Sequence, residues 1–152
     1  MSVPYSDLVQ FYARRFDVPY GLAIAQMMAE SSGNAGARSK VGAIGLFQVM
    51  PSTAAWLEQQ PEPAIMSGIW FLRRLYNEVA DAATDADRWK FALAAYNEGP
   101  GALEKAREQA FARGLDRTRW EDVNPFTPPE TQHYVATIWK AFAGPAGAPA
   151  GL

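Results

Sequence analysis

Hydrophobic residues recur at helical spacing along most of this chain of 152 residues. The first series predicts an amphipathic helix that begins near Pro4, and its apolar positions are Tyr5, Leu8, Val9, Tyr12 and Phe16. The next segment, residues 20–30, is apolar nearly all round, and Pro19 stands where proline favours the first turn of a helix. A helix without a polar face is normally buried, so this one should lie in the core.

Five more helices are predicted downstream, and Pro, Gly and Thr residues mark their ends. They are expected at residues 51–57, 63–80, 84–98, 102–113 and 127–142. Thr84 or Asp85 should cap the third of these, which Gly99 ends, and Gly114 should cap the end of the fourth. The fifth should begin in a capping box with proline in its first turn.

The remaining stretches lack helical periodicity. Residues 31–50 are rich in Gly, Ser and Ala, which predicts either a plain loop or a loop that lines a site, with a short extended piece within 43–50. Residues 115–126 are predicted to be irregular, and the Gly, Pro and Ala residues of 144–152 indicate a flexible tail. We therefore expect one all-α domain of about seven helices at 1–143, with at most a minimal β piece.

Charge and composition limit the partners of the chain. The net charge is −2 and basic residues are scattered, which argues against a nucleic-acid partner. No apolar run is long enough to cross a membrane, so membrane insertion is not expected. The first residues lack the charged and apolar regions of a secretory signal, so a target outside the cytoplasm would require another route of delivery.

The Cys and His content limits the chemistry. With no Cys and His133 as the only His, the sequence excludes a thiol nucleophile, a Cys-ligated zinc site and a histidine metal cluster. We therefore expect neither a metal nor another cofactor. His133 falls within a predicted helix, where a structural or solvent-exposed position is expected.

Glu30 ends the apolar helix, and no other carboxylate occurs between Asp17 and Glu58. Desolvation and the negative end of the helix dipole both disfavour its charged form, so we expect a raised pKa. A neutral Glu can donate a proton at physiological pH, which makes Glu30 a candidate general acid. The alternative is a Glu that only bonds the turn after its helix, and the helix by itself leaves both interpretations open.

Three blocks of sequence extend this argument. The first is Glu30-Ser31-Ser32-Gly33-Asn34, followed by Ser39 and by GAIGLFQVMPSTA at 42–54; the second is AAYNEGPG at 94–101, and the third is PETQHYV at 129–135. Together they resemble the catalytic domain of the soluble lytic transglycosylases, relatives of goose-type lysozyme that cleave the glycan strands of peptidoglycan. The resemblance implies a lysozyme-like fold around a substrate cleft.

The resemblance also implies a role for each matched residue. Glu30 would protonate the glycosidic oxygen between N-acetylmuramic acid and N-acetylglucosamine, and would then take a proton from the muramyl 6-hydroxyl. That hydroxyl attacks the anomeric carbon and leaves a 1,6-anhydromuramyl end, so one protein carboxylate suffices where most glycosidases use two. The other matched positions would support the acid or line the sugar subsites, and they are Ser39, Gln48, Met50, Tyr96 and Asn97.

Four of these supporting residues have a structural alternative. Ser39 could be a turn Ser, Gln48 a polar turn residue, Met50 a core Met and Tyr96 a core Tyr. Glu98 departs from the family, which usually has a small residue there, and we expect its side chain to be solvated. It could instead bind the peptide stem. A position facing Glu30 is disfavoured, because helical geometry points Tyr96 and Glu98 about 200° apart.

Three functions remain open at this point. The first is a lytic transglycosylase that acts on peptidoglycan in the periplasm. The second is a hydrolase of the same bond, similar to goose-type lysozyme, which uses water. The third is an inactive glycan-binding module. The missing signal and small size favour a bacteriophage particle, and a secretion apparatus is the alternative setting; proteins of either assembly would be partners.

Overall fold

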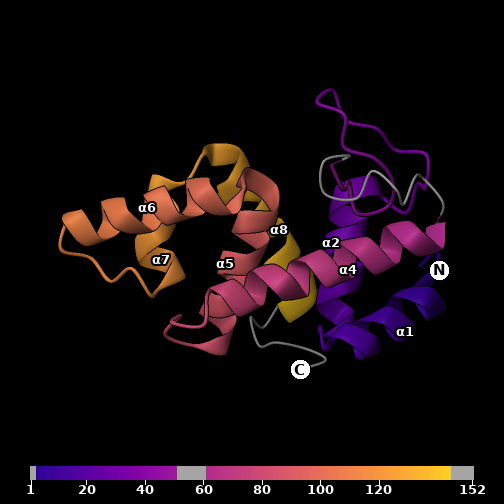
Figure 1. Cartoon of the computed structure of the whole chain (residues 1–152), viewed down its shortest axis with the longest axis horizontal. Helices are drawn as coiled ribbons and strands as arrows, with labels where there is room; N and C mark the ends of the chain where they lie inside the picture. The colour runs from indigo at the N-terminus through magenta and orange to yellow at the C-terminus, as the bar shows by residue number, and fades with distance from the viewer. Residues whose placement is uncertain (1–2, 51–60, 145–152) are drawn as a thin grey trace. The chain divides into compact units, whose positions relative to one another are not determined.

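The computed structural model describes residues 3–50 and 61–144, and this part of the chain is all-α (Figure 1). Its helices are α1 (Ser6–Phe16), α2 (Tyr20–Ser31), α4 (Pro61–Glu78), α5 (Asp85–Glu98), α6 (Pro100–Ala112), α7 (Trp120–Val123), the 3-10 helix η2 (Asn124–Phe126) and α8 (Pro129–Ala143). The expected fold class is confirmed. The helix predicted at 51–57 lies outside the described residues, as does all of the tail beyond Gly144.

Most predicted helix ends agree with the structure to within one or two residues. Thr84 caps α5 as expected, because its hydroxyl oxygen accepts a hydrogen bond from the Asp87 amide at 3.0 Å. Pro19 precedes α2 at the capping position with ψ of 128°, and the helix proper begins one residue later. The helix predicted at 102–113 begins earlier than expected, at Pro100, because a proline fits the first turn.

Residues 115–126 were predicted to be irregular, and this prediction was wrong for its second half, which forms α7 and η2. Contacts with a distant helix stabilise this short element. The Trp120 amide donates to Asp87 Oδ1 at 2.9 Å, and the Trp120 ring packs edge-on against Phe91 with centroids 5.9 Å apart. A four-residue helix has too little periodicity of its own to appear in the sequence.

The chain divides into two compact units. The first unit comprises Met1–Phe71 and Lys140–Leu152, and the second comprises Leu72–Trp139. In the first unit α1 packs against α2, and the Tyr12 hydroxyl donates to Glu62 on α4 at 2.7 Å. Phe47 is fully buried there against Gly68 of α4, where an added Cβ would lie only 2.4 Å from the Phe47 Cβ. The absence of a side chain at Gly68 therefore makes room for Phe47.

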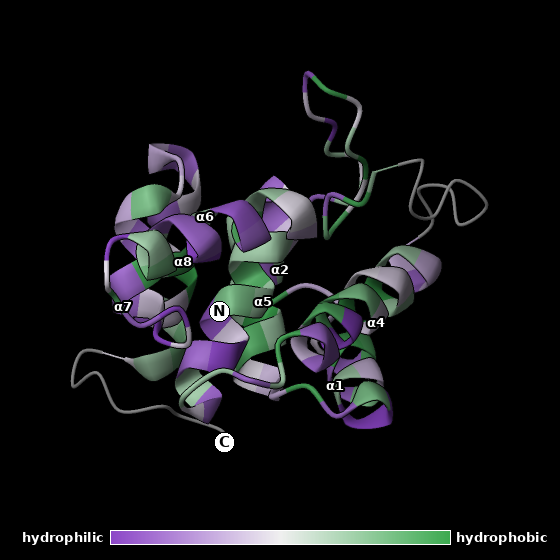
Figure 2. Ribbon diagram, turned by 60° about the vertical axis from the view of Figure 1, so that its left-hand side comes forward, coloured by the Kyte–Doolittle hydropathy of each residue, from purple (hydrophilic) through white to green (hydrophobic). Residues whose placement is uncertain are grey.

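In the second unit, α5 packs against α6 and α7. The side chains that α5 buries are Trp89, Phe91, Ala92, Leu93, Ala94 and Ala95. Figure 2 shows the contrast between the hydrophobic α2 and the largely hydrophilic α6. No helix among the described residues combines the length and the apolar character that crossing a membrane requires.

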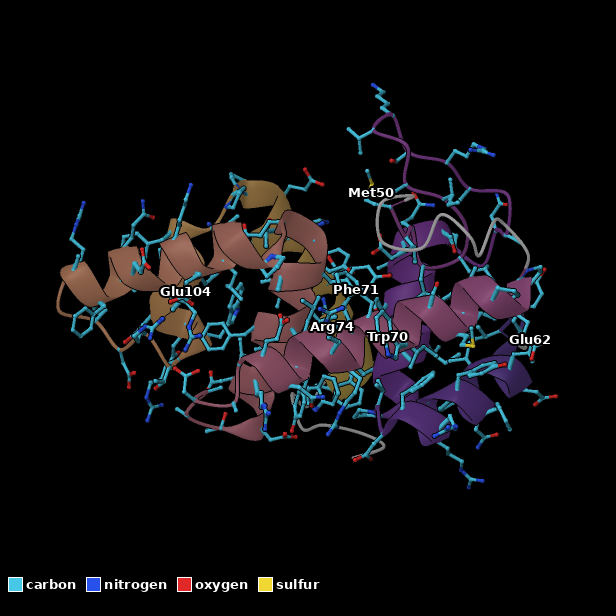
Figure 3. All side chains as sticks on the ribbon, in the orientation of Figure 1. Met50, Glu62, Trp70, Phe71, Arg74 and Glu104 are labelled. Carbon is cyan, nitrogen blue, oxygen red and sulfur yellow. The ribbon has the colours of Figure 1, made fainter. Side chains whose placement is uncertain are left out.

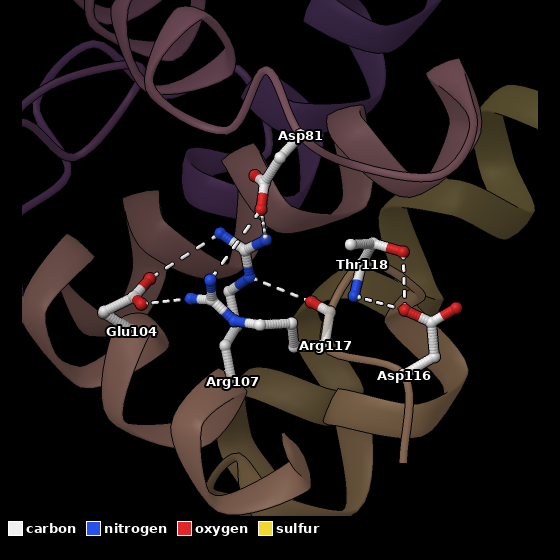
Figure 4. Close-up of polar contacts among 6 residues, drawn as sticks. All are labelled: Asp81, Glu104, Arg107, Asp116, Arg117 and Thr118. Carbon is white, nitrogen blue, oxygen red and sulfur yellow. Dashed lines mark hydrogen bonds and ion pairs between the residues drawn. The ribbon is translucent and has the colours of Figure 1, made fainter.

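A charged network joins three segments of the second unit (Figure 4). The Arg107 side chain is only 4% exposed; it donates to Asp81 at 2.6 Å and to the Arg117 carbonyl oxygen at 3.0 Å. Glu104 pairs with both Arg107 and Arg117. Partial burial would raise the pKa of Asp81, but the hydrogen bond and the charge of Arg107 lower it below its usual value. Arg107 thus holds the 113–119 loop and the turn after α4 against α6.

Candidate active site

Glu30 lies half-buried in the last turn of α2. Ser32 caps the end of the helix and has a left-handed φ of 54°. The Ser31 hydroxyl donates to the Met27 carbonyl oxygen at 3.1 Å and accepts the Gly33 amide at 3.2 Å, which fixes the chain where it leaves the helix. Glu30 is therefore held at the negative end of the helix dipole, as the sequence predicted.

The loop after α2, residues 32–50, contains little regular structure but many hydrogen bonds. Isolated antiparallel bridges join Ile44 to both Arg38 and Val49, in the region where a short extended piece was expected. Ser39 closes the tip: its amide donates to the Ala43 carbonyl oxygen, and its hydroxyl oxygen accepts the Ala43 amide, both at 2.9 Å. Ser39 thus occupies the turn position that was its structural alternative, and its role beside the acid stays a prediction.

Gln48 holds the base of this loop. Its Nε2 donates to the carbonyl oxygens of Ala37 at 3.1 Å and Gly45 at 2.9 Å, so both amide protons are used. Its φ of 49° is unusual for a residue other than Gly, and these two bonds offset the cost of about 1 kcal/mol or more. What remains for a ligand is the carbonyl oxygen Oε1, which can only accept a hydrogen bond.

Met50 is the last described residue of the loop, and its side chain is 39% exposed (Figure 3). The preceding Leu46, Phe47 and Val49 are buried, so the loop is anchored by apolar side chains while Met50 stays accessible. Gly45 has a left-handed φ of 80°, and an added Cβ would lie 3.3 Å from Ala64 on α4. Its place in the loop is therefore explained by packing within the protein.

In the second unit, Tyr96 and Asn97 lie half-buried in the last turn of α5. The Thr131 hydroxyl, on α8, donates to Asn97 Oδ1 at 2.8 Å, which ties the end of α5 to the start of α8. Thr131 was not singled out from the sequence, although it stands within the third block. What distinguishes Thr131 is its burial, because it is a polar residue that is only 1% exposed. Burial cannot be read from the sequence and is known only from the fold.

Glu98 was expected to be solvated, and the structure corrects this expectation. Both of its carboxyl oxygens are buried, and neither hydrogen-bonds to a described residue. Burial raises the pKa of Glu98, and the nearby Thr131 hydroxyl only partly opposes the effect. His133, by contrast, is exposed on α8, in agreement with one of the two positions expected for it.

The residues of the predicted site are divided between the two units. The first contains Glu30 together with the hydrogen-bonded loop that includes Ser39, Gln48 and Met50, and the second contains Tyr96 and Asn97. Residues 7–117 match the model of the transglycosylase SLT domain family. The chain belongs to this family. The resemblance inferred from the three sequence blocks is thereby confirmed.

Relatives and solved structures of the family agree with this assignment. The chain is 35% identical over 128 residues to the membrane-bound lytic murein transglycosylase F of Maricaulis maris, and 34% identical to that of Marinobacter nauticus. Each match covers 82% of this chain but only 28% and 26% of the relative. This chain thus spans about a quarter of the length of these relatives.

Among solved structures, the fold is similar to that of the 70 kDa soluble lytic transglycosylase of Escherichia coli, with a TM-score of 0.71 and 27% identity over 92% of this chain and 24% of that one. It is also similar to an inactive Glu-to-Gln mutant of the Slt lytic transglycosylase of Pseudomonas aeruginosa, with a TM-score of 0.74 and 25% identity over 95% and 25%. A third similar structure is a 70 kDa soluble lytic transglycosylase in complex with bulgecin A, with a TM-score of 0.74 and 26% identity over 90% and 23%.

Proposed function

We propose that this chain is the catalytic domain of a peptidoglycan lytic transglycosylase and that Glu30 is its single general acid and base. The observation that carries the proposal is the place of Glu30: a half-buried carboxyl group at the end of α2, directly before a loop whose sequence matches the family pattern. The similar Pseudomonas enzyme that a Glu-to-Gln substitution inactivates supports a single essential carboxyl group.

The reaction needs one proton donor that later becomes a proton acceptor. Neutral Glu30 donates its proton to the glycosidic oxygen as the bond from that oxygen to the anomeric carbon breaks. The resulting carboxylate takes the proton of the muramyl 6-hydroxyl, whose oxygen forms a bond to the anomeric carbon. Glu30 is then neutral again, and no water is consumed. The 2-acetamido group of the sugar can stabilise the positive charge at the anomeric carbon.

The remaining site residues fit supporting roles. Gln48 is restricted to accepting a hydrogen bond through Oε1, so it would bind a sugar hydroxyl or an amide N–H. Met50 offers an accessible apolar surface for a sugar ring. Tyr96 would hydrogen-bond to the acid or to the acetamido group. Asn97 lies in the same turn of α5 as Tyr96 and accepts a hydrogen bond from the Thr131 hydroxyl on α8.

The product distinguishes this proposal from the hydrolase. Purified peptidoglycan is digested, and the soluble fragments are analysed by mass spectrometry before and after reduction with borohydride. A transglycosylase yields ends that are lighter by one water and resist reduction, whereas a hydrolase yields reducible ends. Reducible ends alone would replace the proposal by the lysozyme-like alternative.

Glu30→Gln tests the acid itself. It keeps the size of the side chain but removes the ionisable proton, so we expect digestion to fall by about 10²- to 10⁴-fold while binding to insoluble peptidoglycan is retained. Glu108→Gln, an exposed change on α6, is the matched control and should leave digestion unchanged. Undiminished digestion by Glu30→Gln would exclude Glu30 as the acid in both enzymatic functions. If wild type binds peptidoglycan but releases no fragments, the inactive binding module is the better description.

The setting follows from the substrate only in part. The proposed substrate places the action at the bacterial cell wall. A phage particle or a secretion apparatus as the host assembly stays a prediction from the sequence, and the genes that neighbour this one would decide between them.

A further inference from the structure

Glu98 is a buried acid that the proposed mechanism does not use. It is the last residue of α5, and both carboxyl oxygens are inaccessible to solvent and make no hydrogen bond to a described residue. A charged carboxylate in such a place would lack both water and a donor, which disfavours the charged form. The negative end of the α5 dipole adds to this effect.

Thr131 does little to stabilise the charge. It opposes the raised pKa of Glu98 only in part, and its single hydroxyl proton is donated to Asn97 Oδ1 at 2.8 Å. That proton is therefore not available to a charged Glu98 carboxylate.

Charged groups on the neighbouring elements are engaged elsewhere. Lys90 of α5 lies over the Trp139 ring at 4.9 Å, and Glu104 of α6 pairs with Arg107 and Arg117. Glu130 and His133 of α8 are exposed. No ion pair joins Glu98 to any residue in the described parts of the chain, so no cation favours its charged form.

We propose that Glu98 is a positioning residue that works as a neutral carboxylic acid and so keeps the last turn of α5, with Tyr96 and Asn97, in place. Ionisation of Glu98 puts a charge where its oxygens have neither water nor a donor, and this loosens the end of the helix. The consequence for substrate binding rests on the proposed function, whereas the neutral state of Glu98 and its effect on stability do not.

The pH dependence has a defined direction. Because the pKa of Glu98 is raised above its usual 4.5 in the folded state, its contribution to stability is fully present below pH 4.5 and is lost as the pH rises through the folded pKa. Glu98→Gln keeps the size of the side chain and cannot ionise. The variant should therefore unfold at a higher temperature than wild type at pH 8, by about 3 °C or more, and the difference should vanish below pH 4.5.

Thermal unfolding of wild type, Glu98→Gln and the exposed control Glu108→Gln between pH 4 and 9 tests the neutral acid. A Glu98→Gln midpoint at or below that of wild type at pH 8 would overturn it, as would a difference that is the same at every pH. If Glu98→Gln does not fold, titration of the side-chain carbons in ¹³C-labelled wild type decides. A Glu98 midpoint above 4.5 supports the proposal, and one at or below 4.5 refutes it.

Binding to insoluble peptidoglycan tests the positioning role. It is measured in the Glu30→Gln background, so that the substrate is not consumed. Binding, followed from pH 4 to pH 9, should weaken as the pH rises through the folded pKa of Glu98 and should persist when Glu98→Gln is added. Equal pH dependence in the two proteins would exclude the positioning role. Failure of Glu30→Gln to bind at any pH would count against the proposed function, while the unfolding data would still decide the state of Glu98.

Discussion

Two irregular segments among the described residues are stabilised by different forces. The 32–50 loop of the first unit uses side chains that bond to backbone, with Ser39 at its tip and Gln48 at its base, and it is seated by Phe47 against Gly68. The 113–119 loop of the second unit is held by the charged network of Arg107.

This difference indicates how each segment tolerates change. A loop that is folded by bonds to its own backbone and seated by one tight apolar contact depends on shape, because the contact allows no added volume. A loop that is held by ion pairs depends on charge, and its half-exposed partners can turn to water when the pair is broken. Substitutions that change shape should therefore affect the first segment most.

Gly68→Ala should have the largest effect on stability. The added Cβ would lie 2.4 Å from the Phe47 Cβ and 2.5 Å from its Cγ, and both residues are buried. The clash must displace the ring and the loop, at a cost of about 3 kcal/mol in the free energy of unfolding. Chemical denaturation measures the change. Gly101→Ala on α6, where an added Cβ meets nothing within 4 Å, is the control and should change stability by less than about 1 kcal/mol.

Arg107→Ala should come second. It leaves the Arg117 carbonyl oxygen without its donor and removes a nearly buried side chain, but Asp81 is half-exposed and can be hydrated. We expect a loss of about 2 kcal/mol in denaturation experiments. The exposed pair of Arg74 and Glu78, 3.9 Å apart, provides the control, since Arg74→Ala should cost about 0.5 kcal/mol or less. Equal losses in the two variants would contradict the role given to the network.

Gln48→Glu should have the smallest of the three effects on unfolding. It preserves the shape of the side chain but replaces the amide donor with an oxygen that faces the carbonyl oxygens of Ala37 and Gly45. The loss of two hydrogen bonds should cost about 1 to 2 kcal/mol. Gln109→Glu, exposed on α6, is the control with the same change of charge. If Gln48→Glu were as destabilising as Gly68→Ala, polar bonds would be the main support of the loop and the comparison would fail.

Much of the helical framework was predictable because its causes are local. Periodic apolar residues marked α1, α4 and α8, and the Thr84 cap and the Gly99 stop marked the ends of α5. The short helix α7 was missed because its support comes from Asp87 and Phe91, about thirty residues earlier in the chain. Local patterns contain no record of such partners.

The candidate site was predictable to a different degree. The apolar helix and the isolated carboxylate at its end marked Glu30 as a candidate acid, and the sequence blocks around it gave the right family. The blocks did not reveal that the Gln48 amide is used up within its loop, because a hydrogen bond to Ala37 depends on how the chain turns between the two residues. The roles assigned to Ser39, Met50, Tyr96 and Asn97 stay predictions.

By itself, then, the sequence determined most of the described helices, the family and the position of the candidate acid, since periodicity, capping and motif spacing act over a few residues at a time. Tertiary structure decided which polar groups lose their water. Glu98 was expected in solvent and is buried beside Thr131, which lies on another helix. The ionisation of a side chain depends on all the atoms that surround it, and those atoms come together only when the chain folds.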